Sequence, residues 1–299
     1  MTHSKKLSRL DVRTTELGLF PNQQLAQAAI MSGAVLVNGV KSTKPGVSVR
    51  ADSIIEINPS WVKPRYVSRG GLKLEKALYV FNINPQGRTC LDIGASTGGF
   101  TDCLLQHGAL RVYSVDVGHG QLDWGLRQNP RVVVKERINA RYLQPELIYS
   151  NTGIWANLAV IDVSFISLYK ILPGCLLVLE KPHCDLIALI KPQFEADKSM
   201  VGPKGVITSP STQIKIIEKV LAEASTLGLK ACNLTFSPIK GPAGNIEYLV
   251  YWSLEEPTST INITSVVSDA HHQLFKSSGI QDSEQAALMH SPGTDFANT

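Results

Sequence analysis

The chain has 299 residues, a net charge of +4 and a hydrophobic content of 43%, values that are typical of a globular protein with one α/β domain and a smaller second domain. It has no apolar run long enough to cross a membrane, and no apolar segment of a secretion signal follows Met1. Its five cysteines are an odd number without C-x-x-C spacing. We therefore expect no metal site, no disulfide framework and a cytoplasmic location.

Residues 5–58 predict a small α+β domain. Ser8 and Asn22 are the expected N-caps of two helices that end at Gly18 and Gly33. A hairpin is expected at 35–40, since Asn-Gly is the strongest signal for a two-residue turn, and 54–57 adds a further strand.

Charge is unevenly distributed along the chain. Residues 1–65 hold nine basic and four acidic side chains, whereas the chain from Glu255 onward holds one basic and six acidic ones. Lys5, Arg9 and Arg13 recur every fourth residue and would share one helix face, with Lys41 and Lys44 beyond the hairpin turn. This spacing suits a nucleic-acid phosphate backbone, although such a face is often only solvated surface.

A linker is expected at 59–66, because Pro59 and Pro64 interrupt regular structure there. After it, 68–81 predicts an amphipathic helix, with apolar residues at 74, 77, 78 and 81. Lys73 and Lys76 share a face of this helix, and nothing in the pattern distinguishes either from a surface lysine.

Cys90 to Thr101 predicts a buried strand, a glycine turn at Gly94, Gly98 and Gly99, and a helix that follows it. The spacing is G-x-x-x-G-G and Asp92 precedes the first glycine, which differs from the dinucleotide fingerprint. A carboxylate there suits a positively charged ligand. A second strand, 112–117, contains Asp116 at the distance expected for an acid that binds ribose hydroxyls. The pair of aspartates predicts S-adenosylmethionine. The alternative is a capping aspartate in another α/β enzyme.

Five further strands are expected: 132–135 before Asn139, a strand that ends at Asp162, 185–190 before Lys191, and an antiparallel pair at 231–236 and 247–252. A helix is expected at 211–227. The fold class is therefore α/β, with a mostly parallel, Rossmann-like seven-stranded sheet and an antiparallel last strand. Residues 255–299 predict a disordered acidic tail, with one possible helix at 266–275 and two solvated histidines, His271 and His272.

Lys73, Asp162, Lys191 and Glu247 can meet at one edge of this sheet, because the carboxyl ends of parallel strands lie together. Methyl transfer to a ribose hydroxyl needs alignment and removal of a proton. A free lysine, with a pKa of ~10.4, is protonated and cannot act as a base. Burial and a second lysine would lower that value, whereas the two carboxylates would raise it. The alternative is a structural cluster of ion pairs.

The N-terminal pattern resembles an S4-like RNA-binding domain. The resemblance is carried by Ser8-Arg9-Leu10-Asp11, Leu17-Gly18-Leu19, Ala28-Ala29-Ile30, the segment 32–39 and Thr43-Lys44-Pro45. Asn22-Gln23 stand where that family commonly has Ser-Arg, which removes one expected phosphate contact.

The larger part resembles the TlyA family, which is often labelled haemolysin A and belongs with the FtsJ-like ribose methyltransferases. The similar segments are 90–101, 115–122, 136–141, 162–168, 190–195 and 244–247. The resemblance implies a class I methyltransferase domain at 67–254, S-adenosylmethionine as cofactor and ribosomal RNA as partner, with 2′-O-methylation typically at a cytidine. It also implies a catalytic tetrad of Lys73, Asp162, Lys191 and Glu247. We expect the cofactor to contact Asp92, Gly94, Ser96, Gly98, Gly99, Phe100, Asp116 and Asn139, and RNA to contact Lys5, Arg9, Arg13, Lys41, Lys44 and Arg69.

Two other functions stay open at this stage. The family label suggests a membrane-active cytolysin, against which the absence of a spanning segment counts. A ribosome assembly factor that binds RNA and cofactor without catalysis is the other.

Overall fold

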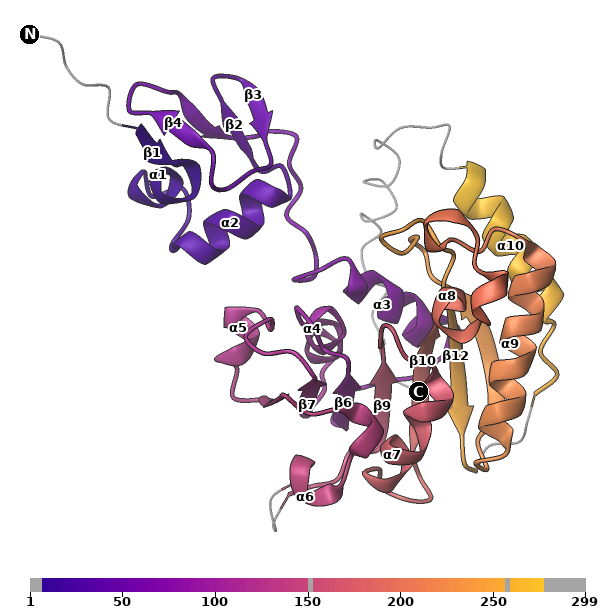
Figure 1. Cartoon of the computed structure of the whole chain (residues 1–299). Coiled ribbons are helices and arrows are strands. Elements are labelled where there is room, and N and C mark those ends of the chain that lie inside the picture. The colour runs from indigo at the N-terminus through magenta and orange to yellow at the C-terminus, as the bar shows by residue number, and fades with distance from the viewer. Residues whose placement is uncertain (1–6, 150–152, 256–258, 277–299) are drawn as a thin grey trace, which may run out of the picture. The chain divides into compact units, whose positions relative to one another are not determined.

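The computed structural model of the protein describes residues 7–149, 153–255 and 259–276. The chain divides into two compact units, Met1–Arg65 and Tyr66–Thr299, which we call the N-terminal unit and the C-terminal unit (Figure 1). Lys5, one of the expected RNA contacts, lies outside the described residues.

The N-terminal unit packs two helices on short strands. Its elements are β1 (Leu7–Arg9), α1 (Leu10–Glu16), α2 (Gln23–Met31), β2 (Val35–Val37), β3 (Val40–Ser42), β4 (Ser48–Arg50) and β5 (Ile55–Ile57). The expected hairpin joins β2 to β3 through Asn38 and Gly39, both of which have a positive φ. Leu10, Ile30 and Val35 are fully buried and form the centre of the core.

The first helix begins later than the sequence predicted. Ser8 does not cap it, because residues 7–9 form β1 and pair with β4, which keeps Arg9 extended as the N-cap. Of the expected basic helix face, only Arg13 therefore lies within α1. The predicted N-cap of the second helix is confirmed, since the side chain of Asn22 accepts a hydrogen bond from the amide of Leu25 and caps α2.

The C-terminal unit is built on a seven-stranded sheet in the order β11-β12-β10-β9-β6-β7-β8. The strands are β6 (Thr89–Ile93), β7 (Arg111–Asp116), β8 (Val132–Glu136), β9 (Leu158–Ile161), β10 (Asp185–Ile190), β11 (Lys230–Phe236) and β12 (Tyr248–Ser253). Only β12 runs antiparallel to its neighbours, β10 and β11. The predicted fold class is confirmed.

Helices cover both faces of this sheet. They are α3 (Gly70–Phe81), α4 (Gly99–Gln106), α5 (Trp124–Arg127), α6 (Pro145–Ile148), α7 (Leu172–Leu177), α8 (Pro192–Glu195), α9 (Pro210–Ser225) and α10 (Ile263–Lys276), with short 3-10 turns at 140–142, 168–170, 198–200 and 203–205. Alternate strand residues face opposite sides. Leu91 joins the core under α6, α7, α9 and α10, whereas its neighbour Cys90 joins the core under α3, α4 and α5.

The helix α10 agrees with the possible helix that the sequence indicated at 266–275, and it packs on the C-terminal unit rather than standing in a tail. It lies beside α9 and also contacts β11 (Figure 1). Val267 and Ala270 are buried in the same core as α9. Apolar residues at helical spacing give the segment a face to bury, which is why the sequence already indicated a possible helix at 266–275. The expected tail beyond Lys276 lies outside the described residues.

Candidate active site

Four titratable side chains form two ion pairs at one edge of the sheet. Lys73 Nζ lies 2.6 Å from Glu247 Oε2, and Lys191 Nζ lies 2.6 Å from Asp162 Oδ1. Lys191 also donates to Ser164 Oγ at 2.8 Å. All four line one cavity of about 690 Å³. The structure thus brings together every member of the expected tetrad.

Strand direction explains this meeting. Asp162 and Lys191 each follow the last residue of a parallel strand, β9 and β10, so both lie at the same sheet edge. Lys191 is extended and Pro192 begins α8, as expected for a residue before proline. Glu247 reaches the same edge because it precedes β12, which runs the other way. A Cβ on Gly241 would lie only 2.4 Å from Glu247 Oε1, so glycine makes room for this carboxylate.

The glycine turn between β6 and α4 adjoins the ion pairs. A Cβ on Gly94 would lie 2.4 Å from the carbonyl oxygen of Asp162, and one on Gly99 would lie 2.9 Å from the amide nitrogen of Gly71. The turn therefore packs against the loop that carries Asp162 and against the start of α3, which carries Lys73. Only residues without a side chain permit both approaches.

A second cavity, of about 500 Å³, is also lined by Gly94 and Ser96 of this turn. It shares Gly94, Ser96, Asp162, Ser164 and Phe165 with the first cavity, so the two adjoin. Asp116 lines it and accepts hydrogen bonds from the amides of Ser96 at 2.8 Å and Gly118 at 2.7 Å.

The expected cofactor residues are distributed over both cavities. Ser96 and Gly94 line both, Gly99 and Phe100 line the larger one, and Asp116 and Asn139 line the smaller one. Asn139 accepts from the amide of Arg141 at 3.0 Å. Gly98 lines neither cavity; a side chain there would meet Leu122 and Leu126.

Asp92 lies beneath the turn and lines neither cavity, although a position at the lip of the strand was expected. It is fully buried, and its Oδ2 accepts from Thr101 Oγ1 at 2.6 Å. Its Oδ1 has no hydrogen-bond partner. Burial raises the pKa of Asp92 to about 7, and the charges of Asp162 and Asp116 add to this effect.

Several cavity residues escaped the sequence predictions. Phe165 is 89% exposed, has a φ of +64°, and its ring lies 4.9 Å from that of Phe194. Lys204 and Lys240 line the larger cavity together with the expected Arg69. Phe165 lies within a segment that carried the family resemblance, Lys204 lies in a loop at 195–210 that the glycines and prolines of the sequence predict near the site, and no local pattern marked Lys240.

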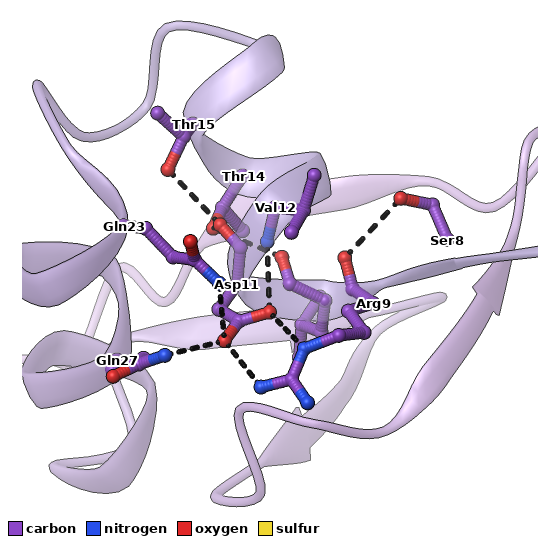
Figure 2. A network of polar contacts seen from close by, with 9 residues as sticks. Ser8, Arg9, Asp11, Val12, Thr14, Thr15, Gln23 and Gln27 are labelled. Atoms are coloured by element: carbon purple, nitrogen blue, oxygen red, sulfur yellow. Dashed lines mark hydrogen bonds and ion pairs between the residues drawn. The ribbon is translucent and has the colours of Figure 1, made fainter.

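In the N-terminal unit, Arg9 belongs to a polar network centred on Asp11 (Figure 2). Arg9 Nε and Nη2 donate to the two carboxylate oxygens of Asp11 at 3.0 and 2.7 Å. Gln23 and Gln27 donate to Oδ2 at 3.1 and 2.7 Å, and the amide of Val12 donates to Oδ1 at 2.9 Å. Asp11 is fully buried, while the side chain of Arg9 remains 54% exposed. The network thus holds an exposed cation in a fixed position.

The other expected RNA contacts of this unit are surface cations. Lys41 and Lys44 are exposed, and the aliphatic part of Lys41 packs on Gly33. Arg13 is half-buried and pairs with Glu16 at 3.2 Å.

The described residues also bear on two other classes of protein, those that span membranes and those that bind metal ions. Across 7–149, 153–255 and 259–276, no helix is both long and apolar enough to span a membrane. The same residues contain no group of three or more His, Cys, Asp or Glu side chains that could hold a metal ion. All five cysteines are free thiols.

Comparison with known proteins adds independent findings. Residues 66–254 match the family model described as FtsJ-like methyltransferase, and residues 8–55 match the S4 domain. The 16S/23S rRNA (cytidine-2′-O)-methyltransferase TlyA of Mycobacterium tuberculosis (strain ATCC 25618 / H37Rv) is 40% identical over 89% of this chain and 96% of its own length. Hemolysin A of Brachyspira hyodysenteriae is 42% identical over 82% of this chain and 99% of its own length.

A solved structure from Streptococcus thermophilus, which carries a hemolysin name, superimposes with a TM-score of 0.71 and 41% identity. It covers 93% of this chain and 100% of its own. Proteins with two different kinds of name therefore share this architecture.

Proposed function

The chain belongs to the FtsJ-like methyltransferase family and contains an S4 domain, and we propose that it transfers a methyl group from S-adenosylmethionine to a ribose 2′-hydroxyl of ribosomal RNA. A cytidine is the proposed target, as named for the Mycobacterium tuberculosis relative. The observation that carries the proposal is the pairing of Lys191 with Asp162 where the two cavities adjoin. At such a junction a methyl donor in one cavity and an accepting hydroxyl in the other can come together.

The smaller cavity fits the cofactor in size and in chemistry. Its volume of about 500 Å³ lies within the range typical of small-molecule sites. Asp116 and Asn139 would hold the nucleoside, and Gly94 and Ser96 of the turn would accommodate the methionine part close to the backbone. Oδ1 of Asp92 is buried without a hydrogen-bond partner among the described residues, and a cationic ligand at the turn would favour the charged form of this carboxyl, which itself lines neither cavity. When bound, S-adenosylmethionine supplies an electrophilic methyl group.

We assign the removal of the hydroxyl proton to Lys191, which accepts the proton as the neutral amine and becomes an ammonium beside Asp162. It lines the cavity at the junction, and Asp162 and Ser164 fix the direction of its Nζ. In this assignment Asp162 orients the amine toward the ribose oxygen, and alignment of the reacting groups supplies much of the rate.

Lys73 and Glu247 form the second pair in the same cavity and would position the ribose. Glu247 is 1% exposed, so its charge requires the contact with Lys73 at 2.6 Å. Lys73 would then present a fixed donor to the substrate.

RNA would approach through the rim of the larger cavity. Arg69, Lys204 and Lys240 supply positive charge for phosphates there. Phe165 exposes its ring at both cavities and could stack on an unpaired base. In the N-terminal unit, Arg9, Arg13, Lys41 and Lys44 are the proposed phosphate contacts. A substrate of this kind implies a cytoplasmic protein.

The test is transfer of labelled methyl groups from S-adenosylmethionine to ribosomal subunits, with ribose methylation mapped by position. We expect Lys191→Ala to lower the rate by about 10³-fold, in the range of general acid–base catalysis. Lys215→Ala, which changes an exposed lysine of α9 outside both cavities, is the control. No transfer by the native protein would refute the function, and full activity of Lys191→Ala would refute the mechanism.

The competing functions have separate readouts. Release of dye from liposomes by the native protein would favour the cytolysin function that the name Hemolysin A suggests for the Brachyspira hyodysenteriae relative. Ribosome assembly that survives loss of all four tetrad side chains would favour a non-catalytic factor.

A further inference from the structure

The helix α10 is joined to the strand that follows Glu247 by a short chain of polar contacts. His271 of α10 has its Nε2 2.8 Å from Gln213 Oε1 of α9. The same oxygen accepts from the hydroxyl of Tyr248 at 2.6 Å. Because an amide oxygen only accepts, His271 donates in this pair. Tyr248 is the next residue after Glu247, so the contacts reach the beginning of β12.

The other end of the Gln213 amide reaches a loop of the larger cavity. Gln213 Nε2 donates to the carbonyl of Ile207 at 2.8 Å. The amide of Ile207 donates to Asn245 Oδ1 at 2.9 Å, and Asn245 Nδ2 donates to the carbonyl of Gly205 at 2.9 Å. These bonds fix residues 205–207 from two sides.

One branch ends at residues that line the proposed RNA cavity, and the other ends at Tyr248, next to the cavity residue Glu247. Gly205 and Asn245 line the cavity, together with Val201 and Lys204 of the same loop. Gln213 and Asn245 are each 1% exposed, and Tyr248 is fully buried. A buried amide is costly unless all its groups are bonded, and removal of one partner leaves the others unsatisfied. The network therefore responds as a unit when one member is lost.

We propose that His271 and Gln213 are positioning residues, through which α10 holds the 201–207 loop and the beginning of β12 in the shape that receives RNA. This inference rests on the proposed function, because it treats the larger cavity as the place of the substrate. It gives a role to a helix that lies beyond residues 66–254, the part matched by the FtsJ-like model. Neither residue touches the reacting atoms.

The primary test is hydrogen exchange of the full-length protein, because it does not require activity. Loss of a hydrogen bond worth about 1 kcal/mol corresponds to about fivefold faster exchange. We expect His271→Ala to accelerate exchange about fivefold in peptides that cover 201–207, while peptides that cover 89–106 do not change. His271→Gln, which keeps a donor, should restore slow exchange. His272→Ala changes an exposed neighbour and is the matched control.

Kinetics give the second readout. His271→Ala and Gln213→Glu should raise the KM for ribosomal RNA about fivefold and leave the Kd for S-adenosylmethionine unchanged, because the 201–207 loop does not line the smaller cavity. Gln213→Glu keeps an acceptor for Tyr248, replaces the donor to Ile207 with a carboxylate oxygen and adds a buried charge, so it is the more disruptive of the two variants.

Three results would overturn the proposal. The first is the same exchange rate at 201–207 in His271→Ala and His272→Ala. The second is equal acceleration at 201–207 and 89–106 in His271→Ala, which would indicate general loosening of the fold. The third is a KM for RNA in His271→Ala that stays at the native value. If the native protein shows no methyl transfer but the exchange pattern appears as expected, the proposed function fails while the positioning of the loop stands.

Discussion

Two aspartates, one in each unit, are buried to the same extent but differ in their hydrogen-bond partners and in the direction of their pKa shift. Asp11 and Asp92 are both fully buried. The guanidinium of Arg9 lowers the pKa of Asp11 well below its usual range, and both of its oxygens accept hydrogen bonds. Burial instead raises the pKa of Asp92 to about 7, and only Thr101 donates to its carboxylate. Partners, rather than burial alone, decide whether a buried carboxyl is charged.

The difference also separates structural from functional positions. The side chains that bind Asp11 are the ones that cover it, so the carboxylate joins α1 to α2 and has no group left for a ligand. Asp92 retains an unpartnered oxygen below the glycine turn, a costly arrangement that structural roles do not require. Buried groups of this kind concentrate at functional sites.

The largest expected effect is on the network of the N-terminal unit. Asp11→Ala should lower the free energy of unfolding of that unit by about 2 kcal/mol, because it leaves the donors of Arg9, Gln23 and Gln27 without their acceptor. Hydrogen exchange of N-terminal peptides in the full-length chain measures this loss. A change below 0.5 kcal/mol, on the order of that for an ordinary surface substitution, would contradict a structural role for Asp11.

The same site has a defined pH dependence. Since the folded pKa of Asp11 is depressed, its stabilising contribution is present above the unfolded value of about 4 and declines as the pH falls below it. The difference in stability between the native protein and Asp11→Asn should therefore shrink below about pH 4.

An opposite dependence is expected at Asp92. Its folded pKa is raised to about 7, whereas the unfolded value is about 4. Between these two values the folded state keeps a proton that the unfolded state has already lost. The stability of the C-terminal unit therefore falls as the pH rises from about 4 to about 7. Asp92→Asn should remove this fall. The stability of the variant relative to the native protein should therefore rise by on the order of 2 kcal/mol between pH 5 and pH 8. Urea unfolding at both values, without cofactor, measures it.

Glu146→Gln, at an exposed carboxylate of α6, is the control for this experiment. If the native protein and Asp92→Asn showed the same slope of stability against pH, the contrast between the two aspartates would be lost.

The smallest effects distinguish the two glutamines that bind Asp11. Gln27 is half-buried and donates at 2.7 Å, whereas Gln23 is exposed and donates at 3.1 Å. We expect Gln27→Ala to cost about 1 kcal/mol and Gln23→Ala about 0.5 kcal/mol, measured by exchange in the same peptides. A reversed order would mean that solvent exposure does not weaken these bonds.

Much of the fold followed from local patterns. Apolar strand segments and the glycines after β6 predicted the seven-stranded sheet of the C-terminal unit, and the Asn38-Gly39 turn predicted the hairpin of the N-terminal unit. These signals depend only on residues close together in the chain. The tetrad could be proposed because Asp162 and Lys191 follow parallel strands, whose ends meet by topology.

The failures have a common cause. The start of α1 was wrong because β1 pairs with β4, some 40 residues away, and that pairing overrides the local cap signal. The sequence indicated a possible helix at 266–275, but only the contacts with α9 and β11 show that this helix packs on the core rather than standing in an acidic tail.

By itself, the sequence determined which residues can act as acid, base or cation, and which segments form strands, since both are properties of neighbouring residues. Only the tertiary structure decided that Asp11 is paired and Asp92 is not, that Lys73 meets Glu247, and that His271 reaches Gln213. Partners and burial depend on contacts between distant segments, and these set the charge and the position of each group.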